Sequence, residues 1–309
     1  MPSSALSPEA KLHQDVLDYF EFWPSHAASI VALVLMFLAG TAVLVITVRT
    51  RAWFMLIATI VAYLEVVGFG LRLDMFNHPV RGVYITMQCL LIIPPSFLAL
   101  IDYMALGKLV ALIQVTKPPG TKFTLKPKFI TWIFFGLEIA SLAAQGAGAG
   151  LSVGGNTGPP VNAGAGKGLL IAGLVTLVVL IAFFLCTTIY VQRNPQMQVP
   201  ECRPTMRLIF LGLYATTILL LIRNTFRVVE FSNGWYGWIA RHEVFFYVFD
   251  SLIIFSWLCV MVPLHFGINI KRLQQQTAPL AQNTDIAGKG FPGGHNVVAD
   301  SGVRNTEMV

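Results

Sequence analysis

Charged side chains recur at helical intervals inside two strongly apolar stretches of this chain, joined by a short turn at Ser232–Arg241. Each stretch carries a trio of polar residues at positions i, i+4 and i+7, which lie on one face of a helix. The two trios are Arg223, Arg227 and Glu230, followed by Glu243, Tyr247 and Asp250. The spacing predicts two apolar helices that present charged faces to each other, where acids pair with arginines or bind a charged ligand.

The composition places these charges in an apolar setting. The chain has 309 residues, of which 55% are hydrophobic and 12% are charged. A soluble domain carries about 25% charged residues, and the mean hydropathy here is +0.69. These values indicate an integral membrane protein. The net charge of +6 then reports Lys and Arg in the loops, and we expect no nucleic-acid partner.

Apolar runs predict an all-α fold, a bundle of seven transmembrane helices, because each run approaches the roughly 20 residues that cross a bilayer. Residues 1–26 form an N-terminal tail, either disordered or with a short helix at the membrane surface, and residues 268–309 a disordered C-terminal tail. A Gly-rich segment, Gly146–Gly168, predicts a flexible loop. The expected spans are about 27–48, 52–71, 82–106, 129–149, 169–190, 208–231 and 243–267.

Basic residues predict the orientation, since cytoplasmic loops of membrane proteins are enriched in Lys and Arg. The loops after the first, third and fifth spans, with the start of the C-terminal tail, are the basic ones. We therefore expect the N-terminus outside and the C-terminus in the cytoplasm. The plasma membrane is our expected location, which the basic residues do not decide. The basic residues on the cytoplasmic side are Arg49, Arg51, Lys117, Lys122, Lys126, Lys128, Arg193, Arg203, Arg207, Lys271 and Arg272.

Placing a charged residue within a span costs about 2.5–3.5 kcal/mol of insertion free energy, so these residues must face the bundle interior. The second, sixth and seventh spans predict a mixed-charge cavity in the outer half. For any one residue, a structural ion pair remains as good an explanation as ligand binding. For the whole set we favour a ligand-binding or water-accessible cavity. Its candidate residues are Glu65, Arg72, Arg223, Arg227, Glu230, Glu243, Tyr247 and Asp250.

Further polar residues recur along other spans. In the third span, three residues repeat every seventh position, and Pro94-Pro95 predicts a kink or break. Two polar residues lie seven apart in the fourth span, and a histidine near the end of the seventh could titrate or bond a carbonyl. These secondary candidates are Gln88, Pro95 and Asp102, then Glu138 and Gln145, then His265.

Catalytic and metal-binding signatures are missing from the sequence. An intramembrane zinc site needs several histidines at depth, and His265 alone qualifies. The seventh span has no lysine for a Schiff base, and no Gly-x-Ser-x-Gly motif occurs. Lys167 follows Gly166 as in a phosphate-binding loop, but Val161 replaces the required first glycine. We therefore expect no enzyme, no metal and no cofactor.

The chain resembles the fungal RTA1-like proteins, the lipid-translocating exporter family. The resemblance covers the seven spans and departs at two positions: Glu138 stands where the family usually has Asp, and Phe266 where it has Pro. Its most specific part runs from the sixth to the seventh span. The motif residues are Glu65, Gly68, Arg72, Gln88, Pro94, Pro95, Tyr103, Phe135, Glu138, Gln145, Gly146, Arg223, Phe226, Arg227, Glu230, Gly234, Gly237, Glu243, Tyr247, Asp250 and His265.

This resemblance implies seven membrane helices, an extracellular N-terminus, a fungal source and a role in resistance to toxic amphiphiles such as sphingoid long-chain bases. The leading hypothesis is an exporter of such a lipid or lipid-like compound that hydrolyses no ATP. Its partner would be a membrane lipid or an amphiphilic small molecule. The alternative is a seven-helix receptor or stress sensor for a lipid-like ligand.

Overall fold

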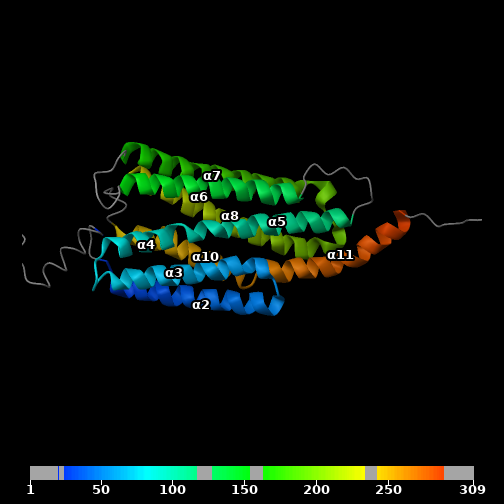
Figure 1. Ribbon diagram of the computed structural model, residues 1–309. Coiled ribbons are helices and arrows are strands. Elements are labelled where there is room, and N and C mark those ends of the chain that lie inside the picture. The colour runs from blue at the N-terminus through cyan, green and yellow to red at the C-terminus, as the bar shows by residue number, and fades with distance from the viewer. Residues whose placement is uncertain (1–19, 21–23, 117–126, 154–162, 234–241, 289–309) are drawn as a thin grey trace, which may run out of the picture.

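The computed structural model shows a single bundle of long helices (Figure 1). It describes residue 20 and residues 24–116, 127–153, 163–233 and 242–288. Across those ranges every regular element is helical and no strand occurs. The all-α fold class is therefore confirmed for the described residues, whereas most of the N-terminal tail lies outside them.

Six segments of the described chain are long and apolar enough to cross a membrane, which makes this a multi-pass integral membrane protein. They are His26–Thr50, Trp53–Asp74, Gly82–Val115, Gly164–Arg193, Pro200–Ser232 and Glu243–Leu280. The predicted fourth span coincides with a further helix that is not among the six. The helices are α2 (His26–Thr50), α3 (Leu56–Asp74), α4 (Arg81–Ile92), α5 (Leu98–Val115), α6 (Pro127–Val153), α7 (Ala163–Arg193), α8 (Arg203–Ser232), α9 (Glu243–Phe246), α10 (Leu252–Met261) and α11 (Phe266–Gly288).

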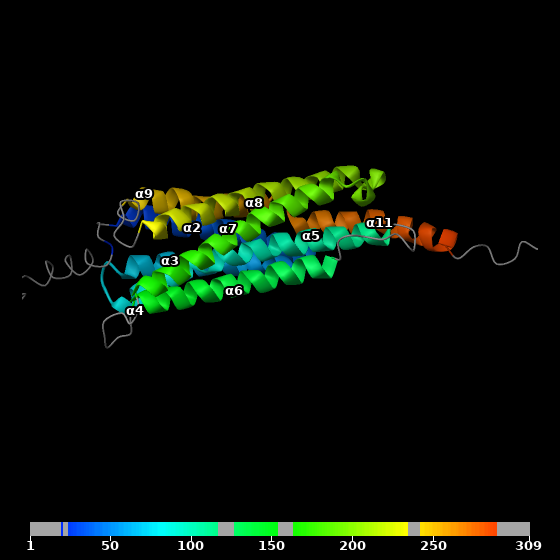
Figure 2. The ribbon, with the colours of Figure 1, turned by 90° about the horizontal axis from the view of Figure 1, so that it is seen from above.

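Sequence neighbours pack side by side along most of the bundle, with α2 against α3, α6 against α7 and α7 against α8. Helix α5 lies within the bundle (Figure 2) and contacts α3, α6, α7, α8 and α11. Its side chains are buried on nearly every face. Outer helices instead expose large apolar residues such as Phe37, Phe183 and Leu211. Such surfaces suit contact with lipid tails.

The bundle has two chemically different ends. At one end α2, α5 and α7 finish and α3, α6 and α8 begin, and α11 extends past it (Figure 1). We call this the basic end, because the described arginines and lysines there include Arg49, Arg51, Arg193, Arg203, Arg207, Lys271 and Arg272. Helix α2 begins at the other, opposite end, so the first and last described helices leave the bundle on different sides.

Glycines bring α6 and α7 into backbone contact. A Cβ on Gly148 would lie 2.4 Å from the Leu170 nitrogen, and one on Gly173 would lie 2.9 Å from the Ser141 carbonyl oxygen. The Ser141 hydroxyl donates a hydrogen bond to the Gly173 carbonyl at 2.5 Å. Small residues and interhelical hydrogen bonds of this kind hold helices together inside membranes.

Proline and a wide helical turn interrupt two of the spans. Pro94 opens a 3₁₀ turn, Pro94–Phe97, that separates α4 from α5, because proline lacks an N–H and clashes with the preceding turn. In the last span a π-helical turn, Tyr247–Ser251, separates α9 from α10. Helix α10 then ends at Met261, just before Pro263.

Two sequence expectations differ from the structure. The predicted disordered tail from residue 268 is helical as far as Gly288, as part of α11. Its Phe266, Ile270 and Leu273 are buried, since α11 packs against α5 and α8. The Gly-rich loop is also shorter than expected, because α6 continues to Val153 and α7 begins at Ala163. Residues 154–162 and 289–309 lie outside the described part of the chain.

Candidate functional site

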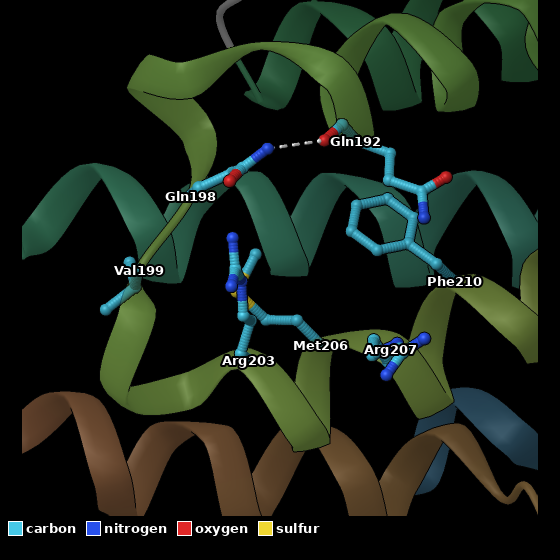
Figure 3. Close-up of a pocket in the computed structure, with 7 residues that line it drawn as sticks. All are labelled: Gln192, Gln198, Val199, Arg203, Met206, Arg207 and Phe210. Carbon is cyan, nitrogen blue, oxygen red and sulfur yellow. Dashed lines mark hydrogen bonds between the residues drawn. The ribbon is translucent and has the colours of Figure 1, made fainter.

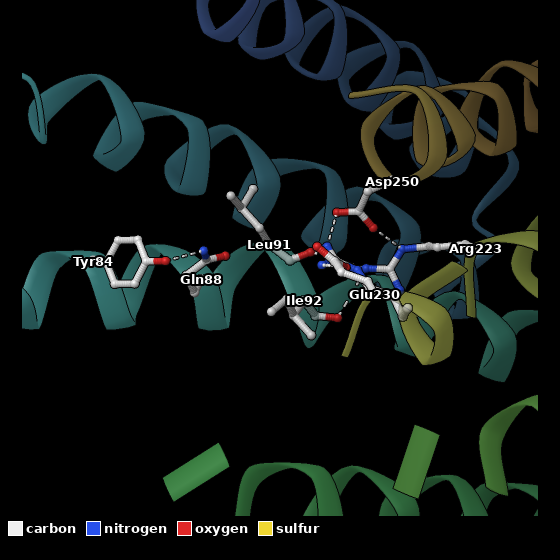
Figure 4. A network of polar contacts seen from close by, with 8 residues as sticks. Tyr84, Gln88, Leu91, Ile92, Arg223, Glu230 and Asp250 are labelled. Carbon is white, nitrogen blue, oxygen red and sulfur yellow. Dashed lines mark hydrogen bonds and ion pairs between the residues drawn. The ribbon is translucent and has the colours of Figure 1, made fainter. Parts of the chain in front are cut away.

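Asp250, in the π-helical turn, is the centre of a buried ionic cluster (Figure 4). Its Oδ1 lies 2.7 Å from Arg223 Nε, at ion-pair distance but outside hydrogen-bond alignment. Its Oδ2 accepts a hydrogen bond from Arg227. Arg227 also donates to Glu230 Oε2 at 2.8 Å. With Glu65, these residues form what we call the charge cluster, in which Asp250 pairs with both Arg223 and Arg227 of α8.

Arg223 also donates hydrogen bonds to backbone carbonyls that lose their helical partners at the proline pair. Pro95 has no N–H to offer the carbonyl of Leu91, and the Ser96 nitrogen donates to Ile93 instead of Ile92. An Arg223 amino group donates to the Leu91 and Ile92 carbonyls, at 3.3 Å each. A broken helix is tolerated at membrane depth when protein groups satisfy the freed carbonyls. The break between α4 and α5 and the charge cluster are therefore one structural unit.

Glu65 is the least satisfied member of the charge cluster. The residue is 1% exposed on α3 and interacts electrostatically with Asp250, Arg223 and Arg227. Its Oε1 has no hydrogen-bond partner among the described residues. Counting charges, Arg223 and Arg227 face Asp250, Glu230 and Glu65, so the cluster holds one more acid than base when all are ionised. The arrangement can accept one further cation or a proton.

A second ion pair lies nearer the opposite end. Arg72, at the end of α3, donates to Glu243 Oε1 at 2.8 Å. The Ser25 backbone nitrogen, just before α2, lies 3.1 and 2.9 Å from the two oxygens of the same carboxylate. Three aromatic rings surround the Arg72 guanidinium, with centroids at 5.0 Å for Phe20, 5.1 Å for Phe246 and 5.8 Å for Tyr247. Cation–π contact and ion pairing together fill this site.

The three polar residues of the last span therefore serve two different sites. Glu243 and Tyr247 face α3 and α2, where the Tyr247 hydroxyl is 2.9 Å from that of Ser29. Asp250 faces α8. The sequence spacing predicts one common face, but the π-helical turn places an extra residue in the helix and changes the rotation.

Asp102 is buried away from both ion-pair sites. Thr216 donates to its Oδ1 at 2.9 Å and Thr217 lies 3.4 Å from its Oδ2. Both threonines are near the middle of α8, so Asp102 lies deep within the bundle. Hydroxyl donors can hold a carboxylate without a cation, which makes Asp102 a link between α5 and α8.

The remaining secondary candidates on α4 to α6 are Glu138, Gln145, Gln88 and Pro95. Each has an environment within the bundle. Glu138 on α6 accepts a 3.0 Å hydrogen bond from Tyr103 on α5. Gln145 is buried on α6, and its Nε2 has no partner in the described part of the chain. Gln88 donates to the Tyr84 hydroxyl at 3.1 Å (Figure 4). Pro95 is buried in the turn between α4 and α5.

His265 has a structural environment at the join between α10 and α11. The Gly267 N–H donates to its Nδ1 at 3.1 Å, which leaves Nε2 facing the Thr47 hydroxyl at 3.2 Å. The ring is fully buried and caps the first turn of α11. Among the described residues, no group of three or more His, Cys, Asp or Glu side chains is arranged to hold a metal ion.

Several partners of the site do not emerge from the sequence analysis. Phe20 and Phe246 enclose Arg72, and Thr216 and Thr217 hold Asp102. Aromatic and hydroxyl residues are common in apolar helices, so spacing alone does not single them out. The helical spacing of apolar residues before position 24 is the one signal that points to a role for Phe20.

Comparison with known proteins decides the family. A family model described as "RTA1 like protein" matches residues 58–272. This stretch contains every residue of the charge cluster and the Arg72–Glu243 pair. The chain belongs to the RTA1-like protein family. The resemblance seen in the sequence motifs is thereby confirmed.

Curated RTA1-like relatives come from Saccharomyces cerevisiae. Protoporphyrin uptake protein 1 is 31% identical over 61% of this chain, and Protein RTA1 is 25% identical over 74%. Protein RTM1 is 29% identical over 61%. The matches span 61%, 71% and 60% of the relatives' own lengths, respectively. No solved structure gives a significant match to the chain.

Proposed function

We propose that this RTA1-like protein is a translocase that exports an amphiphilic lipid or lipid-like compound of the sphingoid long-chain-base type. The observation that carries the proposal is Glu65, a buried carboxylate with an oxygen that no described donor satisfies. A long-chain base carries an ammonium group on an apolar chain. That group would supply the cation that the charge cluster lacks, while the lipid-facing helices accommodate the chain.

The proposal includes a seventh span, formed by α6. This helix has 27 residues, which gives about 40 Å of length, enough for the hydrocarbon core of about 30 Å. It packs closely along α7, which is itself apolar enough to cross. Its sequence between Phe129 and Ala149 carries Glu138 as its only charged residue, and that carboxylate is hydrogen-bonded to Tyr103 in the interior.

The proposed orientation places the basic end in the cytoplasm and the N-terminus outside, in the plasma membrane. The positive-inside preference supports it. On this orientation the charge cluster and the Arg72–Glu243 pair lie in the outer half of the bundle, nearer the side from which an exported compound leaves.

Within the charge cluster the residues have unequal roles. Arg223 is occupied by Asp250 and by the two carbonyls of the α4–α5 break, and Arg227 by Asp250 and Glu230. We assign them to holding the helices. Glu65 would bind the ammonium group of the cargo. When the cargo leaves, Glu65 would take up a proton in its place. Such an exchange couples export to an ion gradient, which suits a sequence without an ATP-binding motif. The proposal assigns the protein no enzymatic reaction.

One relative supports movement of an amphiphile, although its name gives the direction opposite to the proposed export. It is named for the uptake of protoporphyrin, a compound with a large apolar surface. The export direction and the sphingoid cargo are therefore parts of the proposal that need separate measurement. A receptor for a lipid-like ligand would use the same cluster without net flux.

The decisive experiment is flux through purified protein in liposomes, with a panel of fluorescent cationic, zwitterionic and anionic lipids. We expect the cationic long-chain base to move, and Glu65→Gln to lower its rate about tenfold or more, the loss expected for one charge-assisted contact. Thermal stability of Glu65→Gln should stay near wild type, because no hydrogen bond to Oε1 is removed. Glu201→Gln, at an exposed site near the basic end, serves as the matched control.

Each outcome separates the hypotheses. Binding of the long-chain base without flux would favour the receptor. Flux of the anionic lipid alone would reject Glu65 as the ligand group. Equal flux in wild type and Glu65→Gln would reject the charge cluster as the transport site.

A further inference from the structure

A pocket opens at the basic end, between the end of α7 and the start of α8 (Figure 3). Its volume is about 380 Å³, within the range of small-molecule sites. It lies at the other end of the bundle from the Arg72–Glu243 pair and shares no residue with the charge cluster. The residues that line it are Gln192, Gln198, Val199, Arg203, Met206, Arg207 and Phe210.

Two arginines give the pocket its charge. Arg203 and Arg207 project from successive turns of α8 into the pocket (Figure 3), and both are exposed. No acidic residue lines the pocket, and no ion pair to either arginine occurs within the described ranges. Like charges at i, i+4 repel each other by a few tenths of a kcal/mol. An anion bound between them would relieve this repulsion.

The start of α8 adds to the excess of positive charge at the pocket. The N-terminal end of a helix carries partial positive charge and favours acidic side chains. Helix α8 has no acidic residue in its first turn and no side-chain cap, but it has Arg203 there. Three sources of positive potential, two guanidinium groups and the helix end, therefore converge on a preformed hollow.

Both polar and apolar groups line the pocket. The Gln198 amide donates to the Gln192 carbonyl at 3.2 Å (Figure 3), and Tyr214 donates to the Gln192 side-chain oxygen. That bond leaves the Gln192 Nε2 group as a donor. Val199, Met206 and Phe210 are buried apolar residues of the wall. A free inorganic anion has no apolar group to pack against this wall. A lipid has one, because the first carbons of its chains follow the headgroup.

The position along the bundle matches the headgroup layer. Helix α8 has 30 residues, about 45 Å, and exceeds the hydrocarbon core of about 30 Å by roughly 7 Å at each end if centred. Arg203 and Arg207 fall within about the first 6 Å of the helix. The pocket therefore opens where phosphate groups of a bilayer lie.

We propose that this pocket is a binding site for the phosphate of an anionic membrane lipid, held by Arg203 and Arg207. Arginine suits this role because its planar fork binds phosphate oxygens in pairs, and basic pockets between membrane helices bind lipid headgroups. On the orientation proposed above, the lipid belongs to the cytoplasmic leaflet. The site is separate from the transported compound and does not depend on its identity.

The test uses the full-length protein in detergent and follows its thermal midpoint by tryptophan fluorescence. The probes are dioctanoyl phosphatidic acid, dioctanoylglycerol without the phosphate, and inorganic phosphate. We expect a saturable rise in the midpoint with phosphatidic acid only. The double variant R203Q/R207Q should raise the apparent Kd at least about tenfold, since each charge-assisted contact contributes more than a neutral one.

Two controls keep the result interpretable. R193Q removes an arginine from the same end of the bundle that does not line the pocket, and its response should equal that of wild type. The ligand-free midpoint of R203Q/R207Q should be at or above that of wild type, because a repulsion has been removed. Q192L, which keeps both arginines, should weaken binding less than the double variant.

Three results would overturn the proposal. An unchanged response in R203Q/R207Q would place the lipid elsewhere. An equal rise with dioctanoylglycerol would show a purely apolar interaction. An equal rise with inorganic phosphate at the same concentrations would assign the pocket to a free anion in place of a lipid.

Discussion

Single residues in the charge cluster have more than one structural task. Arg223 neutralises Asp250 and also satisfies two carbonyls that Pro95 and the following 3₁₀ turn release. A lysine could supply the charge but has no planar fork to reach several acceptors at fixed geometry. The guanidinium group therefore explains how a broken helix and an uncommon density of buried charge occur together.

Arg227 should be essential for folding, because Arg227→Ala leaves Arg223 as the one cation of the charge cluster against the buried Asp250 and Glu65. Breaking a buried pair in this way costs roughly 3–5 kcal/mol. We expect little Arg227→Ala protein in the membrane and an early-eluting, aggregated peak when a fluorescent fusion is chromatographed in detergent.

Glu230→Gln provides the comparison for that variant. Its side chain is 17% exposed, against 3% for Arg227, so water compensates for part of the lost contact. We expect near-normal amounts of this protein. Normal expression of Arg227→Ala with a selective loss of ligand binding would contradict the structural role and assign Arg227 to the ligand.

The sequence predicts which charged residues are buried, but not all of the partners that they contact. Spacing and the expense of buried charge identify Arg223, Arg227 and Asp250 as interior groups, and the structure brings these three together. Spacing cannot reveal that Glu243 and Asp250 diverge, because it assumes a regular α-helix, whereas Asp250 lies in a π-helical turn. Nor can it pair Asp102 with Thr216, since hydroxyl residues are frequent in apolar helices.

At the scale of elements, glycines let the backbones of α6 and α7 approach each other closely. The contact at Gly148 is with the backbone of Leu170 and Gly166, which cannot move aside as a flexible side chain would. Membrane helices associate largely through such close packing, because lipid is as apolar as the helix surfaces. The pair therefore depends on a small residue at this position.

Gly148→Ala should separate α6 from α7 and destabilise the protein by about 1–3 kcal/mol, the usual cost of overpacking. Its thermal midpoint in detergent would fall. Gly146→Ala is the matched control two residues earlier on α6, where an added Cβ meets no described atom within 4 Å. Because alanine favours helix over glycine by about 1 kcal/mol, Gly146→Ala should be neutral or stabilising. Equal midpoints for the two variants would refute the close contact.

Element boundaries were harder to predict than element positions. Apolar runs located the six spans of the described chain well, but the helix after Pro263 escaped notice because α11 is polar overall. Its buried Phe266, Ile270 and Leu273 recur at helical spacing only when the partner surface on α5 and α8 is known. Similarly, glycine content suggested a loop from Gly146 onward, whereas α6 continues to Val153 and Gly148 packs it against the backbone of α7.

At the scale of the whole molecule, two polar sites occupy the two halves of one apolar bundle. The charge cluster has an excess of acid, and the pocket between α7 and α8 has an excess of arginine. A cationic compound would be attracted to the first, and an anionic lipid to the second. On the two proposals above, the protein would be anchored by an anionic lipid at the basic end and would move a cationic compound through the other half.

The number of crossings decides on which sides of the membrane the two termini lie. If α6 crosses with the six other segments, the total is odd and the termini are on different sides; if it does not, they share a side. We expect an N-terminal epitope tag to bind antibody on intact cells and a C-terminal tag to bind only after permeabilisation. Both tags accessible, or both hidden, would remove α6 from the spans, and the inverse pattern would reverse the orientation. A tagged Gly148→Ala variant would show whether the pairing of α6 with α7 is what keeps α6 inserted.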